Sequence, residues 1–558
     1  MINLPFFTKK EIKVKPLVLL VIDGFGLAPP SGGNAISLAR TPHYQSYLKD
    51  YPQTELIASG ESVGLPANEV GNTEVGHLTL GAGRVILQDL KRINLAIEKG
   101  FFYDNKAFLQ ASSHVKESNS KFHIMGLVGS GNVHSSLEHL YALIQFCKKE
   151  GIDKVFLHLF TDGRDSPPQE AKEIVEQVEN RLKNLKIGKI ASISGRYFAM
   201  DRDRRWERTE RVYKALVLSQ AIQVRSSPDA IKSAYAKNQT DEFIEPTLIA
   251  DEQGPIARIE DNDAVIFFNF RIDRSEQLAM AFVLPNFETL KSFDFGYDPE
   301  TDIRLRDVQI SATFQREKVP KNLFFVSMTE YEKNLPVSAV AFGPEVVENP
   351  LSLILSRYGL KQMHMAESEK ERFVKYYFNG LREEPVDGED DLVVPSPKVA
   401  TYDQKPEMSL PGLVKEAIRQ VNKDKYHFFV INFANPDMVA HTGDLNKTVK
   451  AIEYVDEYMG KLIEAVLKVN GTMFVTADHG NAEELLTYPT SAYFYTTAKG
   501  SKNTDHSNNP VPLIIINNRL KGAQVKLAKG SLADVGSTIL TFLNIPVPSE
   551  MQGKNLLY

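Results

Sequence analysis

Short apolar runs that meet charged residues at their ends recur along the chain, and they constrain its fold more than any other feature. The first is residues 16–22, PLVLLVI, which is continuous, rich in β-branched side chains and followed by Asp23. Such a run is typical of a buried, parallel strand. A carboxylate at the carboxyl end of such a strand lies where open α/β sheets bind ligands. Taken alone, Asp23 fits an Asp-Gly turn without a function equally well.

Four more apolar runs lie in the middle of the chain, and helical patterns such as residues 168–183 lie between them. Strands that alternate with helices predict an α/β domain with a largely parallel sheet. These predicted strands cover residues 122–128, 155–160, 189–194 and 264–270.

The segments that follow these four runs are rich in arginine. Arginine offers a planar, bidentate fork to carboxylate and phosphate groups. Several such forks at strand ends favour a pocket for a small, multiply anionic substrate, although any single arginine is more simply a solvated surface residue. The charged residues in these segments include His134, Arg164, Asp165, Arg196, Arg202, Arg271 and Arg274.

Pairs of Asp and His accompany three strand candidates in the last part of the chain, at residues 426–433, 472–476 and 510–516. Carboxylates combined with imidazoles suit Mn²⁺ or Zn²⁺ better than Ca²⁺, which prefers oxygen alone. Six ligands are enough for two ions, and two ions can activate a hydroxyl and clamp a phosphoryl group. The candidate ligands are Asp437, His441, Asp478, His479, His506 and, near the other end of the chain, Asp23.

Such a metal site requires the two ends of the chain to share one domain. The chain has 558 residues, which is too many for one ordinary core. We therefore predict a discontinuous metal-binding domain of residues 1–87 and 323–558, interrupted by an inserted, arginine-rich α/β domain of residues 88–322.

The glycine-rich stretch of residues 64–84, GLPANEVGNTEVGHLTLGAGR, contains Thr73. Its composition predicts a loop with tight, unusual backbone geometry. A hydroxyl held in such a loop can be aimed at a substrate. The alternative is a surface turn in which the threonine caps the next helix. Lys370, at the start of a charged helical segment, is on its own more simply a surface residue.

Composition narrows the classes of partner. Lys and Arg number 65 against 71 Asp and Glu, and this net charge of −6 argues against a nucleic-acid partner. The single cysteine, Cys147, excludes an internal disulfide and fits a reducing compartment. The first apolar run is too short to span a membrane, and the residues before it lack a signal-peptide pattern. We expect a cytoplasmic protein with no membrane partner.

Six motifs together resemble one family, the 2,3-bisphosphoglycerate-independent (cofactor-independent) phosphoglycerate mutases of the alkaline phosphatase superfamily. The resemblance covers almost the whole chain. It implies an α/β fold in which an alkaline-phosphatase-like metal domain carries an inserted second α/β domain, the substrate-binding (phosphotransferase) domain. The motifs are residues 21–26, 71–84, 162–165, 195–208, 435–443 and 476–483.

The resemblance also implies roles for individual residues. One of two divalent ions, expected to be Mn²⁺, would be held by Asp437, His441 and His506, and the other by Asp23, Thr73, Asp478 and His479. Thr73, Asp165 and Lys370 would be catalytic. Substrate would be bound by His134, Arg164, Asp165, Arg196, Arg202, Arg271, Arg274 and Lys370.

The activity implied is the interconversion of 2-phosphoglycerate and 3-phosphoglycerate, an isomerase reaction of glycolysis and gluconeogenesis. It would pass through a phosphothreonine, where the family normally forms a phosphoserine, and would need no 2,3-bisphosphoglycerate. We expect these small molecules to be the only partners of a monomer.

Two departures from the family pattern keep other functions open. Thr73 replaces the family's serine, and the segment between His479 and His506 is longer than usual. Thr73 favours a metal-dependent phosphatase or phosphodiesterase of the same superfamily, whereas the arginine-rich segments argue against it. A second alternative is a metal-binding but inactive relative that is kept as an interaction protein, and the complete sets of metal ligands and of substrate-binding residues argue against it.

Overall fold

The computed structural model describes residues 15–293, 297–298, 303–304, 308–309, 313–487 and 500–557. The chain forms two compact units. Unit 1 comprises Met1–Gln88 and Glu345–Tyr558, and unit 2 comprises Asp89–Pro344.

Unit 1 is built on a sheet that has eight strands in the described residues, in the order β17-β16-β18-β1-β19-β22-β2-β23. The central strand β1 pairs in parallel with β18 and β19, whereas β22 is antiparallel to β19 and β2. All six residues of β1 are buried, as expected for a strand covered on both faces. The bounds are β1 Leu17–Ile22, β2 Gln53–Ile57, β16 Gln362–Glu367, β17 Glu389–Val394, β18 Phe428–Phe433, β19 Thr472–Thr476, β22 Val511–Asn517 and β23 Gly530–Ser531.

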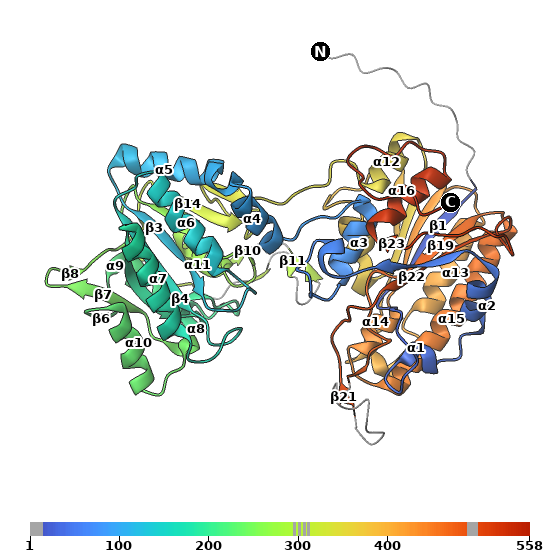
Figure 1. The fold of residues 1–558 in the computed structure, drawn as a ribbon, viewed down its shortest axis with the longest axis horizontal. Helices are drawn as coiled ribbons and strands as arrows, with labels where there is room; N and C mark the ends of the chain where they lie inside the picture. The colour runs from blue at the N-terminus through green and yellow to red at the C-terminus, as the bar shows by residue number, and fades with distance from the viewer. Residues whose placement is uncertain are drawn as a thin grey trace, which may run out of the picture. The chain divides into compact units, whose positions relative to one another are not determined.

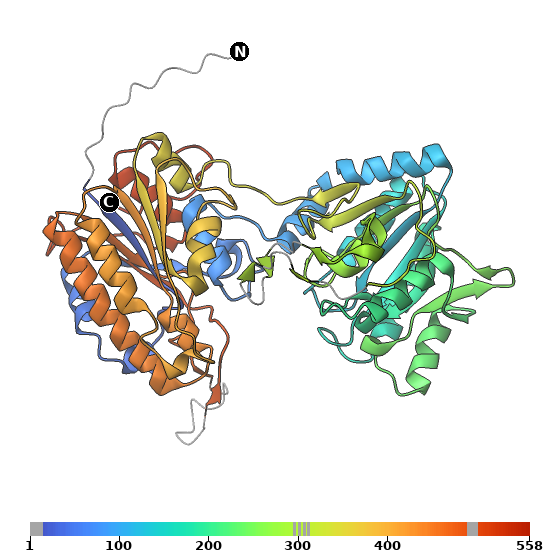
Figure 2. The same cartoon turned by 180° about the vertical axis from the view of Figure 1, so that it is seen from behind.

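Two groups of helices cover this sheet (Figures 1 and 2). The long helix α15 packs against α13, α14, α1 and α2, while α3 packs against α16 and α12. The bounds are α1 Ala35–Leu38, α2 Pro42–Asp50, α3 Thr73–Ala82, α12 Leu351–Arg357, α13 Leu410–Val421, α14 Asn435–Ala440, α15 Leu445–Lys468 and α16 Ala533–Phe542. Short elements are η1 Gly60–Val63, η5 Ser368–Lys370, the π-helix η6 Phe373–Tyr377, η7 Tyr402–Gln404, and the paired strands β20 Leu486–Thr487 and β21 Ser501–Lys502.

Unit 2 is built on a second sheet, in the order β15-β14-β9-β3-β4-β5-β7-β6, with β8 paired to β7. The strands from β15 to β5 are parallel to their neighbours, and β7 is antiparallel to β5. The bounds are β3 Phe122–Val128, β4 Val155–Thr161, β5 Lys189–Gly195, β6 Ile222–Val224, β7 Thr247–Asp251, β8 Gly254–Pro255, β9 Ala264–Phe267, β14 Phe324–Thr329 and β15 Ala339–Phe342. Short paired strands are β10 Ser292–Phe293 with β13 Val308–Gln309, and β11 Tyr297–Asp298 with β12 Ile303–Arg304.

Two hydrophobic cores fill unit 2, and each involves its own set of helices. Helices α4, α5, α6, α7 and α10 contribute to one core, while α8, α9 and α11 contribute to the other (Figures 1 and 2). The predicted fold class, an α/β metal domain with an inserted α/β domain, is confirmed. The bounds are α4 Asp89–Glu98, η2 Phe101–Asp104, α5 Lys106–Ser118, α6 Leu137–Lys149, α7 Ala171–Leu185, α8 Arg196–Ala199, α9 Trp206–Leu218, α10 Ser227–Ala236, η3 Asp241–Phe243, α11 Glu276–Val283 and η4 Phe287–Thr289.

The predicted second boundary, between residues 322 and 323, lies 22 residues before the crossing between the two units, which falls between Pro344 and Glu345. Strand β14 pairs in parallel with β9, and β15 pairs with β14, so both strands belong to unit 2. These long-range pairings assign both strands to unit 2. The first crossing lies between Gln88 and Asp89, one residue after the predicted position.

The prediction of a loop over residues 64–84 is also wrong for its second half, which forms helix α3. The side chain of Asn72 caps this helix by accepting a hydrogen bond from the Val75 amide at 3.0 Å. Two glycines occur inside the helix because other chain segments approach it closely. A Cβ atom at Gly76 would lie 2.6 Å from Cβ of Asp478, and one at Gly81 would collide with the carbonyl oxygen of Phe378.

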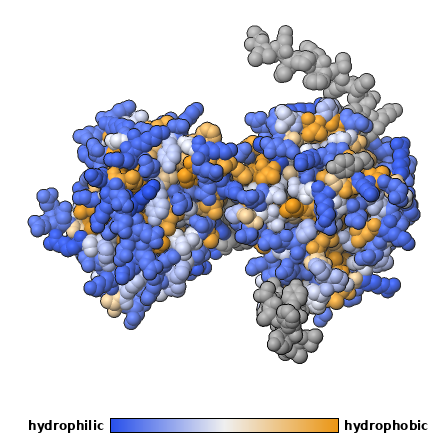
Figure 3. All heavy atoms as spheres, viewed as in Figure 1, coloured by the Kyte–Doolittle hydropathy of each residue, from blue (hydrophilic) through white to orange (hydrophobic). Residues whose placement is uncertain are grey.

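The outer surface of each unit is mostly hydrophilic on the face shown in Figure 3. Apolar side chains occur there in scattered spots. Within the described ranges, no helix combines the length and apolar character needed to cross a membrane.

Candidate metal centre and arginine cluster

Three neighbouring strands of unit 1 bring the predicted metal ligands together. Asp23 follows β1, Asp478 and His479 follow β19, and Asp437 lies in the first turn of α14, directly after β18. Because β1 lies between β18 and β19 and all three are parallel, their carboxyl ends meet at one edge of the sheet.

Asp23, Asp478 and His479 form the first group, in which the possible ligand atoms lie within 4.8 Å of one another. All three residues are fully buried. The hydroxyl of Thr73, the first residue of α3, adjoins this group. Its Oγ1 lies 3.0 Å from Nε2 of His479 and 3.3 Å from Oδ1 of Asp23.

Asp437, His479 and His506 form a second group under the same criterion, so His479 faces both. His441 lies beside the second group, with its Nε2 atom 3.2 Å from Asp437 Oδ1 and 3.2 Å from His506 Nε2. Asp437 and His441 are four residues apart and face the same way on one helical turn. The structure thus brings all six predicted Asp and His ligands together.

The chemistry of these groups fits divalent cations. Burial raises the pKa of Asp437, but the charges of Lys370 and His441 outweigh it and hold that pKa well below its usual range. Asp437 is therefore an anion at neutral pH. Among the described residues, no contact to the buried Oδ2 atom of Asp478 has hydrogen-bond geometry, and its nearest nitrogen is Nδ1 of His77 at 3.2 Å. A buried carboxylate oxygen without a hydrogen bond is costly unless a cation satisfies it.

Lys370 reaches the same place from η5, which follows β16. Its Nζ atom lies 2.8 Å from Asp437 Oδ2, 3.2 Å from Asp23 Oδ2 and 3.0 Å from Thr73 Oγ1. Burial lowers the pKa of Lys370, but the charges of Asp23 and Asp437 outweigh it and raise the pKa above its usual value. The residue is only 5% exposed, so the surface alternative is wrong.

Several residues to which the sequence analysis gave no role support these ligands. Asn481 donates a hydrogen bond to Asp437 Oδ1 at 2.8 Å, and Asn432 donates one to Asp23 Oδ2 at 2.8 Å. Glu483 accepts hydrogen bonds from the amides of Gly26 and Asn481, at 2.9 Å each. Asn481 and Glu483 lie inside a recognised motif, whereas the only signal for Asn432 is a polar residue within an apolar run.

The predicted substrate residues of unit 2 gather around Arg196. Its guanidinium donates to Asp165 Oδ2 at 2.5 Å and to Asp162 Oδ1 at 2.6 Å, and lies 3.1 Å from Nε2 of His134. Burial lowers the pKa of Arg196, but its bonds to Asp165 and Asp162 outweigh it and raise the pKa. This arginine is thus a buried, permanent cation.

Asp273 connects more of these residues, although the sequence analysis assigned it no role. Its carboxylate lies 3.4 Å from His134 Nδ1, 3.3 Å from Arg271 Nε and 3.4 Å from Arg202 Nη1. Burial raises the pKa of Asp273, but His134, Arg271 and Arg274 outweigh it and lower the pKa to about 2. A fixed anion therefore orients three of the predicted substrate residues.

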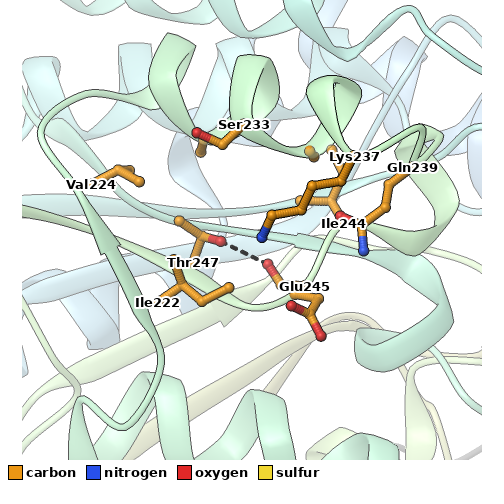
Figure 4. Close-up of a pocket in the computed structure, with 10 residues that line it drawn as sticks. Ile222, Val224, Ser233, Lys237, Gln239, Ile244, Glu245 and Thr247 are labelled. Atoms are coloured by element: carbon orange, nitrogen blue, oxygen red, sulfur yellow. Dashed lines mark hydrogen bonds between the residues drawn. The ribbon is translucent and has the colours of Figure 1, made fainter.

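Arg164, Arg202 and Arg274 line a polar cavity of about 260 Å³, together with Arg205 and Arg208. Burial, followed by the charges of Arg202 and Arg196, lowers the pKa of Arg274. The loss of favourable solvation and the crowding of positive charge would both be relieved by an anion. A smaller hollow between α10 and strands β6 and β7 is lined by Lys237, Glu245 and Thr247 and contains none of the predicted site residues (Figure 4).

Comparison with known proteins assigns the family. Residues 93–333 match the model for the N-terminus of BPG-independent PGAM, and residues 352–545 match the sulfatase model. The chain is 45% identical over 543 residues to the 2,3-bisphosphoglycerate-independent phosphoglycerate mutase of Moorella thermoacetica, covering 97% of this chain and 98% of that one. It belongs to this family. The predicted family and the prediction of a phosphoglycerate mutase, an isomerase, are confirmed.

Other relatives agree with this assignment. The mutase of the same name from Clostridium acetobutylicum is 43% identical over 542 residues, covering 97% of this chain and 99% of that one. A solved structure of Leishmania mexicana phosphoglycerate mutase, at low cobalt concentration, matches with a TM-score of 0.61 and 30% identity. That match covers 98% of each chain.

Proposed function

We propose that this chain interconverts 2-phosphoglycerate and 3-phosphoglycerate, and that Thr73 carries the phosphoryl group between them. The observation that carries the proposal is the position of the Thr73 hydroxyl, 3.0 Å from Lys370 Nζ and 3.0 Å from His479 Nε2. Segments more than 290 residues apart in sequence meet at this one oxygen. The reaction itself comes from the name that the relatives share.

The location of Thr73 also suits a phosphoryl group. It is the first residue of the ten-residue helix α3. The free amide groups and the dipole at a helix N-terminus stabilise a phosphate there. Lys370, held as an ammonium ion by Asp23 and Asp437, adds a positive charge beside the attacking oxygen.

The proposed reaction has two transfers. Oγ1 of Thr73 attacks the phosphorus atom in its ionised form, the bond from phosphorus to the glycerate oxygen breaks, and that oxygen takes the proton of the protonated carboxyl group of Asp165. The second hydroxyl of glycerate then attacks the phosphothreonine, returns a proton to Asp165 and releases Thr73. Splitting the migration in this way replaces one strained transfer by two in-line displacements.

We infer that two divalent cations, expected to be Mn²⁺, complete unit 1. Asp23, Thr73, Asp478 and His479 would hold one, and Asp437, His441 and His506 the other. When bound, such ions favour the ionised hydroxyl and neutralise charge on the phosphoryl oxygens. The family works without 2,3-bisphosphoglycerate, as its name states.

On unit 2, we assign the carboxylate of the substrate to Arg271 and Arg274, because a bidentate arginine matches the geometry of a carboxylate. His134 and Arg196 would contact phosphoryl or hydroxyl oxygens, and Arg164 and Arg202 would complete the positive lining of the cavity. Asp162 and Asp273 keep these cations in place through the bonds described above.

The cellular setting follows from the reaction and from the composition. We propose a monomer that acts in glycolysis and gluconeogenesis in the cytoplasm. The only cysteine in the sequence, Cys147, is buried, and burial raises the pKa of its thiol, so it is unreactive. Light scattering combined with gel filtration tests the monomer, since a dimer would double the measured mass.

A metal-dependent phosphatase or phosphodiesterase remains the alternative, and Thr73 is the feature that favours it. The test is to incubate the pure protein with Mn²⁺ and 3-phosphoglycerate in the absence of 2,3-bisphosphoglycerate. Formation of 2-phosphoglycerate without release of inorganic phosphate supports the mutase. Release of phosphate without 2-phosphoglycerate would support the alternative.

A further inference from the structure

His77 is a buried histidine that lies one helical turn after Thr73 on α3. Its Nδ1 atom lies 3.0 Å from the carbonyl oxygen of Thr73 and 3.2 Å from Oδ2 of Asp478. One face of the ring packs against Phe373, with the ring centroids 5.8 Å apart. His77 thus touches both the proposed nucleophile and a proposed metal ligand, although no role has been assigned to it above.

Asn432 extends this contact to a second proposed ligand. Its Nδ2 atom lies 3.2 Å from Nε2 of His77 and donates to Oδ2 of Asp23 at 2.8 Å. Asn432 belongs to β18, where the other residues of the FFVINF run are apolar, and it is fully buried. Its Oδ1 atom has no hydrogen-bond partner among the described residues.

These contacts are consistent with a single arrangement of protons. The amide of Asn432 must present its NH₂ group to the Asp23 carboxylate, because the opposite orientation would place two oxygens in contact. Its second N–H then points to Nε2 of His77, which accepts the bond. Nδ1 of His77 therefore carries a proton, which it donates to the carbonyl oxygen of Thr73.

A purely structural role does not explain this pair. A buried amide whose oxygen is unpartnered costs stability, so a leucine would suit an ordinary strand position better than Asn432. The polar atoms of His77 and Asn432 instead make contacts where helix α3, which carries the proposed nucleophile, meets Asp23 and Asp478.

We propose that His77 and Asn432 are positioning residues of the phosphoryl-transfer site. They fix Thr73 at the spacing from Asp23 and Asp478 that binding of the metal and attack on phosphorus require. This inference rests on the proposed function. It adds two residues that act through Thr73 and the carboxylates and do not touch substrate.

The first test measures binding of Mn²⁺ alone, by calorimetry, to full-length protein freed of metal by a chelator. His77→Phe keeps the ring but removes both nitrogens, and Asn432→Leu keeps the approximate volume but removes the amide. Each should weaken Mn²⁺ binding by about 10- to 100-fold, the usual cost of losing a residue that orients a ligand. The Mn²⁺-binding step that these variants weaken should be the same step that Asp23→Asn weakens.

His77→Asn is the conservative variant, because its amide nitrogen can replace Nδ1–H but not the acceptor nitrogen. It should recover most of the affinity lost in His77→Phe. The matched control is His364→Phe, since His364 is another buried histidine of unit 1 whose Nδ1 bonds to a backbone carbonyl oxygen, that of Val374, at 2.8 Å. This control should lower thermal stability and leave Mn²⁺ affinity within about twofold of wild type.

The second test is kinetic and uses saturating Mn²⁺. A displaced nucleophile should lower kcat at least tenfold while KM for 3-phosphoglycerate stays within about twofold, because neither residue contacts substrate. Normal Mn²⁺ affinity and kcat in Asn432→Leu and His77→Phe would overturn the proposal. An equal loss of Mn²⁺ affinity in His364→Phe would also overturn it. If His77→Phe fails to fold, Asn432→Leu and His77→Asn decide by the same criteria.

The two tests separate this inference from the proposed function. Mn²⁺ binding is measured without substrate, so its result still tests the positioning role even if the wild-type protein fails to interconvert the phosphoglycerates. Conversely, wild-type mutase activity together with unaltered variants would refute the positioning role and leave the proposed function intact.

Discussion

Thr73 differs from the serine of the family pattern by one methyl group on the carbon that carries the hydroxyl. That methyl restricts rotation about χ1 and must fit beside the phosphoryl group. The hydroxyl nevertheless lies within 3.3 Å of His479, Lys370 and Asp23. The restricted rotation about χ1 therefore holds the hydroxyl oxygen in one place, and it also limits how that oxygen can approach the phosphoryl group.

Substitution of Thr73 tests its proposed role as nucleophile. Thr73→Ala should abolish mutase activity and leave the fold intact, whereas Thr73→Ser should retain or raise activity because it keeps the hydroxyl and removes the methyl. Rapid acid quench with substrate followed by peptide mass spectrometry should recover phosphate on Thr73. The control is Thr79→Val on the same helix, because the buried Oγ1 of Thr79 makes no hydrogen bond among the described residues. Activity in Thr73→Ala would exclude the phosphothreonine.

Arg274 tests the arginine-lined cavity of unit 2. Arg274→Ala would remove the proposed charge-assisted contact to the substrate carboxylate, which should cost roughly 1.5–3 kcal/mol, or about 10- to 150-fold in kcat/KM for 3-phosphoglycerate. Steady-state kinetics measures this. Arg211→Ala is the control, since Arg211 does not line the cavity and pairs with Glu245 at 2.7 Å. If both variants keep wild-type kcat/KM, Arg274 does not bind substrate.

At the scale of elements, helix α3 determines the position of the hydroxyl of Thr73, the proposed nucleophile. Its two internal glycines, Gly76 and Gly81, lower its intrinsic helical stability, since glycine costs about 1 kcal/mol relative to alanine. Glycine is needed at both positions because Asp478 and Phe378 approach the helix too closely for a side chain to fit. Packing against the site therefore takes precedence over helix propensity.

Gly76→Ala tests this balance. Propensity alone would make the substitution stabilising by about 1 kcal/mol, but the new Cβ atom would lie 2.6 Å from Cβ of Asp478. We expect a net loss of about 1–3 kcal/mol in the free energy of unfolding, as for other overpacked sites, and lower mutase activity. Gly412→Ala in α13 is the control, because its Cβ would meet only Val394, at 3.7 Å, and stability should be unchanged or higher. Denaturant unfolding followed by circular dichroism measures both; a stabilised Gly76→Ala would contradict the close approach.

Buried histidines in unit 2 should make its stability depend on pH. Burial lowers the pKa of His139 to about 3, whereas an imidazole in an unfolded chain titrates near 6.5. Above that pH the residue is neutral in both states. As pH falls below about 6.5, only the unfolded state gains the proton, so the free energy of unfolding drops by up to about 1.4 kcal/mol per pH unit. Burial also lowers the pKa of His123 and His158, so they act in the same direction.

The fluorescence of Trp206 measures this effect, because it is the only tryptophan in the sequence and lies in unit 2. Urea unfolding at pH 7.5 and pH 5.5 should show lower stability at pH 5.5. His139→Gln should remove part of that difference, since glutamine can still bond to Asn94, which lies 3.0 Å from Nε2 of His139. An equal pH dependence in this variant would show that His139 does not contribute.

The elements that the sequence predicted best are those whose signal is local. The bounds of β3 and β19 agree with the predicted runs because most of their residues are apolar and lie next to one another in the sequence. Helix α3 was missed because its glycines reflect the tertiary approach of Asp478 and Phe378. The boundary near residue 322 was misplaced because β14 is assigned by its pairing with β9, which is 60 residues away in sequence.

For the site residues, too, those with a local sequence signal were predicted and those that depend on tertiary contacts were not. Asp23, Asp437 and Asp478 were predictable because charged residues at strand ends are a sequence signal, and the parallel sheet brings those ends together. Asn432 was not predictable from its run, since a polar residue inside a buried strand has no defined partner until the neighbouring strands are placed. The segment of residues 488–499, part of the long segment noted between His479 and His506, lies outside the described residues.

On the scale of the whole molecule, the two units differ in the number of chain segments that form them. Unit 2 is one continuous segment, Asp89–Pro344, whereas unit 1 needs two. Strand β1 lies between β18 and β19, and β2 lies between β22 and β23, so each N-terminal strand pairs only with strands from the C-terminal part. Residues 345–558 alone would therefore leave the centre of their sheet without β1, and the buried faces of β18 and β19 would be exposed.

This difference predicts which fragments fold. Residues 89–344 should fold alone and unfold cooperatively, because both of their cores are made within the segment. Residues 345–558 alone should be unfolded or aggregated. Joining Gln88 to Glu345 by a short flexible linker should restore a folded unit 1, since Arg84 and Glu345 already form an ion pair at 3.6 Å and the two ends lie close together.

The linked protein should bind Mn²⁺, because every proposed metal ligand belongs to unit 1, and should lack mutase activity, because the arginine cavity belongs to unit 2. Circular dichroism and calorimetry with Mn²⁺ measure the two properties. The control is the same linked protein carrying Asp23→Asn, which should fold and bind Mn²⁺ more weakly. A folded, linked unit 1 that binds no Mn²⁺ would place the metal site outside the residues assigned here. Mutase activity in that protein would remove the arginine-lined cavity from the reaction.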